Sequence, residues 1–127
     1  MYRHILIPTD GSEVAEHGVA HGLALAKSVG AKVSVINVVE PLFALTGDYA
    51  SVLDRVANAT RDAGISCETI QVENVQPHQA IIATAEGKGC DLIVMSSHGL
   101  SGLSALLIGS VTNKVLAYAK TPVLVCR

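Results

Sequence analysis

Residues 91–116, DLIVMSSHGLSGLSALLIGSVTNKVL, contain a short apolar run, a polar loop and the beginning of a helix. The run Leu92–Met95 has no turn-forming residue, as expected of a strand that is buried on both faces. Gly109 and Ser110 then begin a helix, and the Ser110 hydroxyl can cap it by accepting from a backbone N–H. The first N–H groups of a helix lie at the positive end of its dipole, so this order of elements predicts an anion site. The alternative is a buried strand and a capped helix without a ligand.

The composition fits a single domain of parallel strands and helices. The chain has 127 residues, of which 50% are hydrophobic and 3% aromatic, so the core must consist of Val, Ile, Leu and Ala. The net charge of −2, without a basic tract, argues against nucleic acid as a partner. We expect neither a signal peptide nor a membrane span, because no apolar run is long enough. Three separate cysteines without a CxxC spacing indicate a reducing compartment, and we expect a cytoplasmic protein.

Strand and helix patterns alternate along the whole chain. We expect strands at His4–Pro8, Lys32–Val38, Cys67–Val72, Leu92–Met95 and Pro122–Cys126. We expect helices from Ser12 to about Ser28, from about Asp48 to Ala63 with Val52, Val56 and Ala59 inward, from Pro77 to Lys88, and from Ser110. Strict alternation predicts one α/β domain over residues 1–127, a doubly wound five-stranded parallel sheet with helices on both faces.

Polar residues follow two of the expected strands. Pro8, Thr9 and Asp10 come at the end of the first strand, and residues 96–99 follow the fourth. In open parallel sheets the ligand crevice lies beyond the carboxyl ends of the strands, where the strand order reverses. The first and fourth strands are the natural neighbours at that point, so we expect both polar clusters to line one crevice.

Four segments together resemble the universal stress protein family over nearly the whole chain. They are HILIPTDGSE (4–13), KVSVINVVEP (32–41), CDLIVMSSHG (90–99) and LIGSVTNKVLAYAKTPVLVCR (107–127). The ATP-binding branch of this family carries the pattern G-x2-G-x9-G-[ST]. In this sequence Ser96, Gly99, Gly109 and Ser110 occupy the four positions, so Ser96 replaces the first glycine. Gly102 does not restore the pattern, because only six residues separate it from Gly109.

The resemblance implies a site for ATP or another adenine nucleotide, together with Mg²⁺ or Mn²⁺. Asp10 would lie near the ribose and a phosphate-bound metal, and Val38 would offer its backbone to the adenine edge. Pro8 and Thr9 would shape the floor of the site. The other implied binding residues are Met95, Ser96 and His98, with amides for the phosphates from Gly99, Gly109, Ser110 and Val111. Because no Lys or Arg lies within the loop, a metal would carry more of the charge neutralisation.

Two departures from the family pattern affect the expected affinity. The Cβ of Ser96 can crowd the ligand, whereas its hydroxyl can donate to a ligand oxygen, and we expect weakened rather than abolished binding. The segment between Glu40 and Cys67 is shorter than is usual in the family. The cover over the nucleotide is therefore expected to be trimmed and the site open.

Other functions compete with nucleotide binding. The main alternative is a family member that binds no nucleotide and acts as a dimeric interaction module, which Ser96 favours. A Ser/His/Asp hydrolase using Ser96 or Ser97 with His98 lacks the G-x-S-x-G turn that such enzymes carry. No residue is an obvious base for an attacking water, so we expect at most slow ATP hydrolysis.

His17 and His21 lie four residues apart on the first expected helix and could hold a metal. Their spacing relative to the apolar stripe of that helix favours a solvated face instead.

The last strand is expected at one edge of the sheet and is apolar on both faces. Exposed edges of this kind invite pairing with a second chain. The resemblance implies a homodimer through Pro122–Cys126 and a stress-response role with an unknown protein partner.

Overall fold

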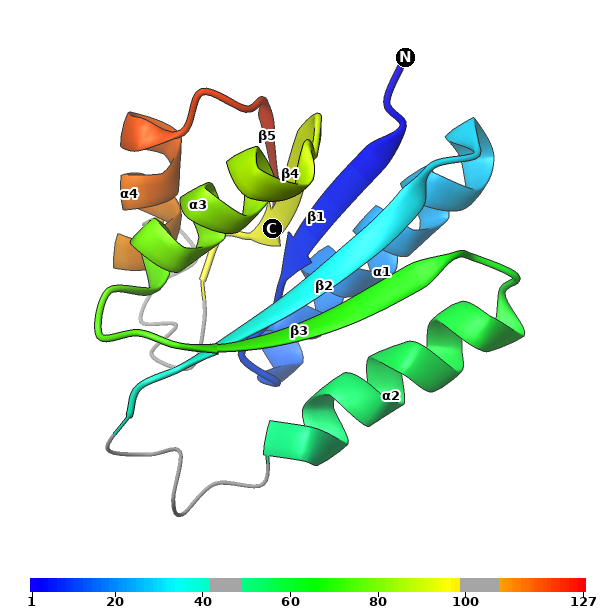
Figure 1. Ribbon diagram of the computed structural model, residues 1–127, viewed down its shortest axis with the longest axis horizontal. Helices are drawn as coiled ribbons and strands as arrows, with labels where there is room; N and C mark the ends of the chain where they lie inside the picture. The colour runs from blue at the N-terminus through cyan, green and yellow to red at the C-terminus, as the bar shows by residue number, and fades with distance from the viewer. Residues whose placement is uncertain (42–48, 99–107) are drawn as a thin grey trace.

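The computed structural model describes residues 1–41, 49–98 and 108–127. Within these ranges five parallel strands and four helices alternate along the chain (Figure 1). The strands are β1 (His4–Pro8), β2 (Lys32–Val39), β3 (Cys67–Glu73), β4 (Leu92–Ser96) and β5 (Val123–Cys126). The helices are α1 (Glu13–Val29), α2 (Tyr49–Asp62), α3 (Pro77–Lys88) and α4 (Ser110–Tyr118). The predicted α/β class and element order are confirmed, with element ends shifted by about one residue.

The sheet has the strand order β3-β2-β1-β4-β5. The central strand β1 pairs with β2 along its whole length, and with β4 through Ile5–Leu92 and Leu6–Ile93. The order reverses between β1 and β4, since β2 and β3 extend to one side and β4 and β5 to the other. The two strands followed by polar clusters are therefore neighbours, as predicted, and their carboxyl ends meet at the reversal point.

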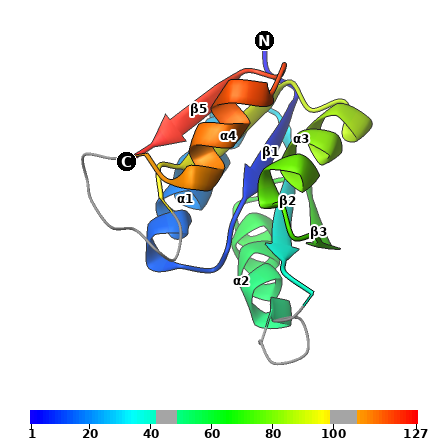
Figure 2. The same ribbon diagram turned by 90° about the vertical axis from the view of Figure 1, so that its left-hand side faces the viewer.

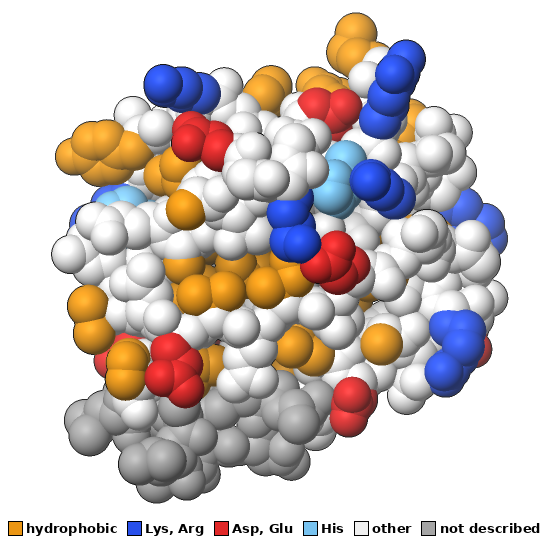
Figure 3. All heavy atoms as spheres, viewed as in Figure 1, with side chains coloured by type: hydrophobic (Ala, Val, Ile, Leu, Met, Phe, Trp, Pro, Cys, Tyr) orange, Lys and Arg blue, Asp and Glu red, His pale blue; other side chains and the backbone are white. Residues whose placement is uncertain are grey.

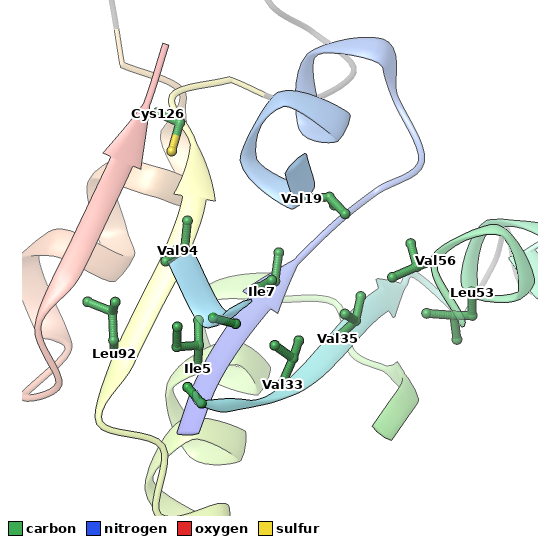
Figure 4. Close-up of a cluster of buried hydrophobic side chains, with 12 residues drawn as sticks. Ile5, Ile7, Val19, Val33, Val35, Leu53, Val56, Leu92, Val94 and Cys126 are labelled. Carbon is green, nitrogen blue, oxygen red and sulfur yellow. The ribbon is translucent and has the colours of Figure 1, made fainter. Parts of the chain in front are cut away.

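Helices cover both faces of the sheet, α1 and α2 on one and α3 and α4 on the other (Figure 2). Under α1 and α2, side chains of β1, β2 and β4 point toward Val19, Leu53 and Val56 (Figure 4). Along the same strands, the alternate residues point to the other face and contribute to a second core under α3 and α4. The central strands are therefore buried on both faces. This explains why their sequences are almost continuously apolar.

The face under α3 and α4 is covered less completely near the edge strand β3. Ile70 and Val72 of β3 are half-buried, whereas the core residues toward the centre are fully enclosed, namely Leu6, Ile36, Ile81, Ile93 and Val115. Figure 3 shows a band of apolar side chains across the middle of the molecule in this view. The second core is therefore less protected at this edge strand than at its centre.

The ends of α1 follow the sequence signals. The Ser12 hydroxyl accepts from the Ala15 N–H at 3.1 Å, and Gly30 ends the helix in a left-handed conformation with φ of 72°. At 17 residues α1 is the longest of the described helices. None of the described helices combines the length and the apolar character needed to cross a membrane.

The inward stripe of α2 differs from the predicted one. Ala59 is exposed, and the buried positions are Leu53, Val56 and Thr60. Sequence patterning favoured the alanine because threonine is polar. Thr60 can be buried because its hydroxyl donates to the Ala57 carbonyl at 2.8 Å, which leaves no unsatisfied donor.

The three cysteines are free: Cys67 begins β3, Cys90 lies between α3 and β4, and Cys126 ends β5. Burial raises the pKa of the Cys90 thiol to about 11, and burial also raises the pKa of Cys67 and of Cys126. These thiols are protonated at neutral pH and serve as small apolar residues, since the thiolate is the reactive form.

Two glycines let α1 lie close to the sheet. A Cβ on Gly18 would lie 2.7 Å from the Ser96 nitrogen and 3.1 Å from the Met95 carbonyl carbon. A Cβ on Gly22 would contact the side chain of Ile7. At Gly18 the obstacle is backbone, so α1 packs directly against the end of β4.

The Gly18→Ala variant should lower the free energy of unfolding by about 1–3 kcal/mol, because the β4 backbone cannot move aside without disturbing the sheet. Gly87→Ala is the matched control, since Gly87 is also helical and a Cβ there meets nothing within 4 Å. That control should gain about 0.5–1 kcal/mol from helix propensity. Urea denaturation measures the free energy of unfolding of both variants. An equal increase in both would contradict the close approach of α1 to the β4 backbone.

His4 is buried at the start of β1, with its Nε2 2.7 Å from the Ser34 hydroxyl. Burial, and to a smaller extent the charge of Lys32, lower the pKa of this imidazole. The folded state therefore favours the neutral ring. Its contribution to stability is complete above the unfolded pKa of roughly 6.5 and is lost as the pH falls toward the folded value.

The free energy of unfolding should accordingly decrease between about pH 7 and about pH 5. His4→Gln should flatten this decrease, because glutamine can bond near Ser34 but does not titrate. His17→Gln, on the exposed side of α1, should leave it unchanged. Urea unfolding at several pH values provides the test, and an equal slope for His4→Gln and the parent chain would contradict it.

Candidate functional site

A cavity of about 390 Å³ lies beyond the carboxyl ends of β1 and β4, where the strand order reverses. Small-molecule sites typically have volumes of about 300–1,000 Å³, so this one can hold a nucleotide-sized ligand. Its walls come from the ends of β1, β2 and β4 and from the first turns of α1, α3 and α4. The lining residues are Pro8, Thr9, Asp10, Ala15, residues 36–40, Pro77, Ile81, Met95, Ser96, His98 and residues 109–112.

Every predicted binding residue within the described ranges lines this cavity. These residues are Pro8, Thr9, Asp10, Val38, Met95, Ser96, His98, Gly109, Ser110 and Val111. Gly99 and Gly102 lie outside the described residues. So does the segment 42–48, on which part of the expected trimmed cover falls.

The cavity has an apolar part and a polar part. Val38, Met95, Ile81 and Val111 belong to the core under α3 and α4, and they form an apolar wall where they reach the cavity. Polar groups come from the turn after β1, the loop after β4 and the start of α4. This arrangement suits a ligand with a flat apolar ring and a polar or anionic tail.

The turn after β1 is fixed by its own side chains. Asp10 Oδ1 accepts from the Ser12 N–H at 2.9 Å, and Thr9 Oγ1 accepts from the Gly11 N–H at 3.2 Å. Gly11 has a φ of +82°, a backbone conformation that is unfavourable for residues with a Cβ. The turn therefore holds the Asp10 carboxylate in a defined position at the cavity wall.

Asn37, which the sequence analysis did not single out, ties β2 to the same turn. Its side chain is 1% exposed, and Nδ2 donates to the Thr9 carbonyl at 3.0 Å. Its Oδ1 is buried and has no hydrogen-bond partner in the part of the chain described. The alternation of β2 places this side chain with Val33 and Val35, on the α1–α2 side of the sheet. A polar residue interrupting the apolar run KVSVINVV is the signal that could have identified it.

Hydrogen bonds fasten the start of α4 to the end of β4. The Ser96 hydroxyl donates to the His98 carbonyl at 2.7 Å, and the Thr112 hydroxyl donates to the Ser96 carbonyl at 2.9 Å. The Gly109 N–H donates to the Ser97 carbonyl at 2.6 Å. Thr112 was not predicted, because its role depends on how α4 folds back over β4.

Two expectations about α4 are corrected by this geometry. Gly109, rather than Ser110, is the N-cap residue, and its extended conformation (φ −62°, ψ 157°) involves no side-chain cap. Ser110 is the first helical residue and is exposed. The Gly109 N–H is used by the Ser97 carbonyl, so it is not directed at an anion. The N–H groups of Ser110, Val111 and Thr112 precede the first intrahelical bond and are the ones that can serve a ligand.

His98 borders the cavity, with its Nδ1 3.0 Å from the Ser97 hydroxyl. Its Nε2 is buried and has no hydrogen-bond partner among the residues described. A hydrolytic triad needs a carboxylate on the nitrogen that the serine does not use. Within the described chain no carboxylate bonds to Nε2, and Ser97 is 6% exposed, so the arrangement does not favour a hydrolase.

His17 and His21 lie on the exposed side of α1, where His21 Nδ1 is 3.2 Å from the His17 carbonyl. The described ranges contain no cluster of three or more His, Cys, Asp or Glu side chains that could hold a metal ion. The solvated-face interpretation of this pair is therefore favoured.

A second hollow of about 590 Å³ lies on the surface between α3 and α4. Its lining includes His78, Glu86, Lys114 and Tyr118, and the rings of His78 and Tyr118 are 6.1 Å apart. This groove is larger but lies away from the reversal point of the sheet and from the polar strand ends. The cavity at the strand ends is the better candidate site.

The fold and this cavity define a parallel α/β domain with a cavity at the reversal point of its sheet. A sequence model of the universal stress protein family matches residues 1–127. The chain belongs to this family, as its motifs predicted. It is 34% identical to universal stress protein MJ0531 of Methanocaldococcus jannaschii, over all of this chain and 83% of that protein. A universal stress protein of Thermus aquaticus is 33% identical over the whole of both chains.

Solved structures show the same fold. Protein MJ0577, whose structure served for a structure-based assignment of biochemical function, superposes with a TM-score of 0.86 and 32% identity. The match covers 98% of this chain and 95% of that one. A universal stress protein in complex with cAMP has a TM-score of 0.82 and 26% identity over 99% of this chain and 97% of its own. At least one relative therefore binds an adenine nucleotide.

Proposed function

We propose that this chain binds an adenine nucleotide in the cavity between β1 and α4. Its output would be a change in conformation or partner binding during a stress response. One observation carries the proposal: an apolar wall and the first N–H groups of α4 line the same cavity at the sheet reversal. The cAMP-bound relative supports an adenine ligand.

Each part of a nucleotide has a counterpart in the lining. The adenine ring would pack on Val38, Met95 and Val111, with the Val38 backbone at its edge. The ribose would lie beside Asp10, whose position the β1–α1 turn fixes. The phosphates would accept from the N–H groups of residues 110–112. The Ser110 hydroxyl is exposed at the same helix end and could donate as well.

A divalent cation fits the charge of the site. The described lining contains the carboxylates of Asp10 and Glu40 and no Lys or Arg. These carboxylates repel a triphosphate, and Mg²⁺ or Mn²⁺ prefers carboxylate and phosphate oxygens as ligands. A cation held by Asp10 and the phosphates would offset that repulsion. We propose binding rather than efficient turnover, and slow hydrolysis stays a prediction.

Titration of the chain with ATP and magnesium in a calorimeter tests the proposal. The parent chain should release or absorb heat and show a higher melting temperature at millimolar nucleotide. Gly109→Val should weaken binding by tenfold or more, on the order expected when two of the phosphate contacts are lost. A Cβ added at Gly109 would lie 3.1 Å from the Ser97 carbonyl oxygen and 3.4 Å from the His98 Cα, so the larger valine side chain must displace the loop.

Gly87→Ala is the control for a glycine substitution away from the cavity, and it should bind like the parent chain. Absence of heat and of a melting shift with the parent chain would favour the alternative, a family member acting only as an interaction module. Unchanged affinity in Gly109→Val would remove the loop from the mechanism.

Ser96 allows a separate test of the glycine replacement in the family motif. Ser96→Ala removes the hydroxyl that holds the His98 carbonyl, and Ser96→Gly removes the Cβ as well. Because the hydroxyl orders the loop, both variants should bind nucleotide several-fold more weakly, a loss of roughly 0.5–1.5 kcal/mol for one hydrogen bond. Tighter binding by Ser96→Gly than by the parent chain would instead show that the Cβ crowds the ligand.

We further propose a homodimer through the outer edge of β5. Leu124 in this strand and Leu116 in the preceding helix are each 42% exposed, and β5 pairs only with β4 among the described strands. Pairing with a second copy would satisfy the outer backbone groups and cover Leu124. The dimer, the protein partner and the cytoplasmic location stay predictions.

A further inference from the structure

The first turn of α4, whose residues 110–112 line the candidate cavity, has no side-chain cap. The helix has nine residues, and its N-cap residue Gly109 contributes no side-chain hydrogen bond. The buried side chain of Val115 anchors the helix about one turn further along. The direction of the first N–H groups therefore depends on the contacts that this turn makes with other elements.

Two hydrogen bonds join this turn to consecutive carbonyls at the end of β4. The Gly109 N–H donates to the Ser97 carbonyl at 2.6 Å. The Thr112 hydroxyl donates to the Ser96 carbonyl at 2.9 Å, and Thr112 is 3% exposed. One bond alone would fix the position of the helix end, whereas two bonds that start three residues apart also fix its rotation about the helix axis. That rotation determines where the free N–H groups of the turn point.

The acceptor of the Thr112 hydroxyl is not the usual one for a helical threonine. Such a hydroxyl commonly bonds to the carbonyl three or four residues earlier, as Thr60 does with Ala57 in α2. Thr112 bonds instead to a strand residue sixteen positions earlier. This acceptor is held from the other face of the sheet, because α1 packs at Gly18 against the backbone of Ser96. The bond therefore ties the first turn of α4 to a rigid part of the sheet.

We propose that Thr112 is a positioning residue for the phosphates, which acts through its bond to Ser96 and not through a contact of its own hydroxyl with the ligand. A hydroxyl has one proton to donate, and this one is given to the buried carbonyl. The inference rests on the proposed function and assigns the orientation of the anion-binding amides to one side chain. Because Val38 and Met95 of the apolar wall belong to the sheet, loss of the bond should weaken phosphate binding and leave the base in place.

Thr112→Val tests the proposal, because valine keeps the branched shape of the side chain and removes the hydroxyl. Its affinity for ATP with magnesium should fall by about three- to tenfold, as expected when one or two N–H contacts with the phosphates weaken. Its affinity for adenosine, which has no phosphate, should equal that of the parent chain. Thr112→Ser keeps the hydroxyl and should bind ATP like the parent chain. Calorimetric titration measures each of these affinities.

Thr60→Val is the matched control. Thr60 is 2% exposed, and the same substitution there removes a hydroxyl-to-carbonyl bond of 2.8 Å in α2, away from the described lining of the cavity. Both valine variants should melt about 2–8 °C lower than the parent chain, since each loses one buried hydrogen bond. Thr112→Val alone should also lose affinity for ATP, so a general loss of stability is separated from misplacement of the amides.

Several results would overturn the role of Thr112 in a parent chain that binds ATP. These are an unchanged affinity for ATP in Thr112→Val, an equal loss in Thr60→Val, an equal loss in Thr112→Ser, or a loss of the same size for adenosine in Thr112→Val. Each of them leaves the proposed function standing, because the parent chain still binds the nucleotide. If the parent chain does not bind ATP at millimolar concentration, the proposed function itself is wrong and this inference falls with it.

Discussion

The pairing of β1 with β4 determines where the other elements of this chain can lie. β1 is completely buried between β2 and β4, and the Ile5–Leu92 and Leu6–Ile93 pairs set the register across the reversal of the sheet. Parallel strands in one register end at the same edge, so the turn after β1 and the loop after β4 meet there. The cavity follows from this topology, because the connections of the two strands leave in opposite directions and none of the described helices covers the gap between them.

Local contacts then give that gap a defined shape. Gly18 allows α1 to press against the backbone at Ser96, and the Thr112 hydroxyl draws α4 onto the Ser96 carbonyl. On the opposite wall the Asn37 amide holds the Thr9 carbonyl behind the turn that carries Asp10. Backbone groups of β1, β2 and β4 are thereby fixed relative to the N-terminus of α4. Preorganisation of this kind lowers the cost of ordering the site when a ligand binds.

The sequence predicted most of the fold and lining because both depend on local pattern. Alternating apolar runs and helix signals located nine elements, and the polar residues after two strands located the cavity. The predictions that were wrong depended on packing between elements or on hydrogen bonds that the sequence pattern does not show. Thr60 replaced Ala59 in the core because a helix carbonyl satisfies its hydroxyl. Gly109 replaced Ser110 as the cap because its N–H is drawn to the Ser97 carbonyl, a contact between residues on different elements. Asn37 and Thr112 were not predicted because their hydrogen bonds also join residues on different elements.

The central claim is that the apolar wall and the first turn of α4 receive one ligand. Amide and methyl chemical shifts of the labelled chain, recorded during titration with ATP and magnesium, test it most directly. The account predicts shifts at Val38 and Met95 from the base and at the amides of residues 110–112 from the phosphates. The groove that contains His78 and Tyr118 should stay unperturbed. Shifts confined to that groove, or no shifts at millimolar nucleotide, would contradict the account.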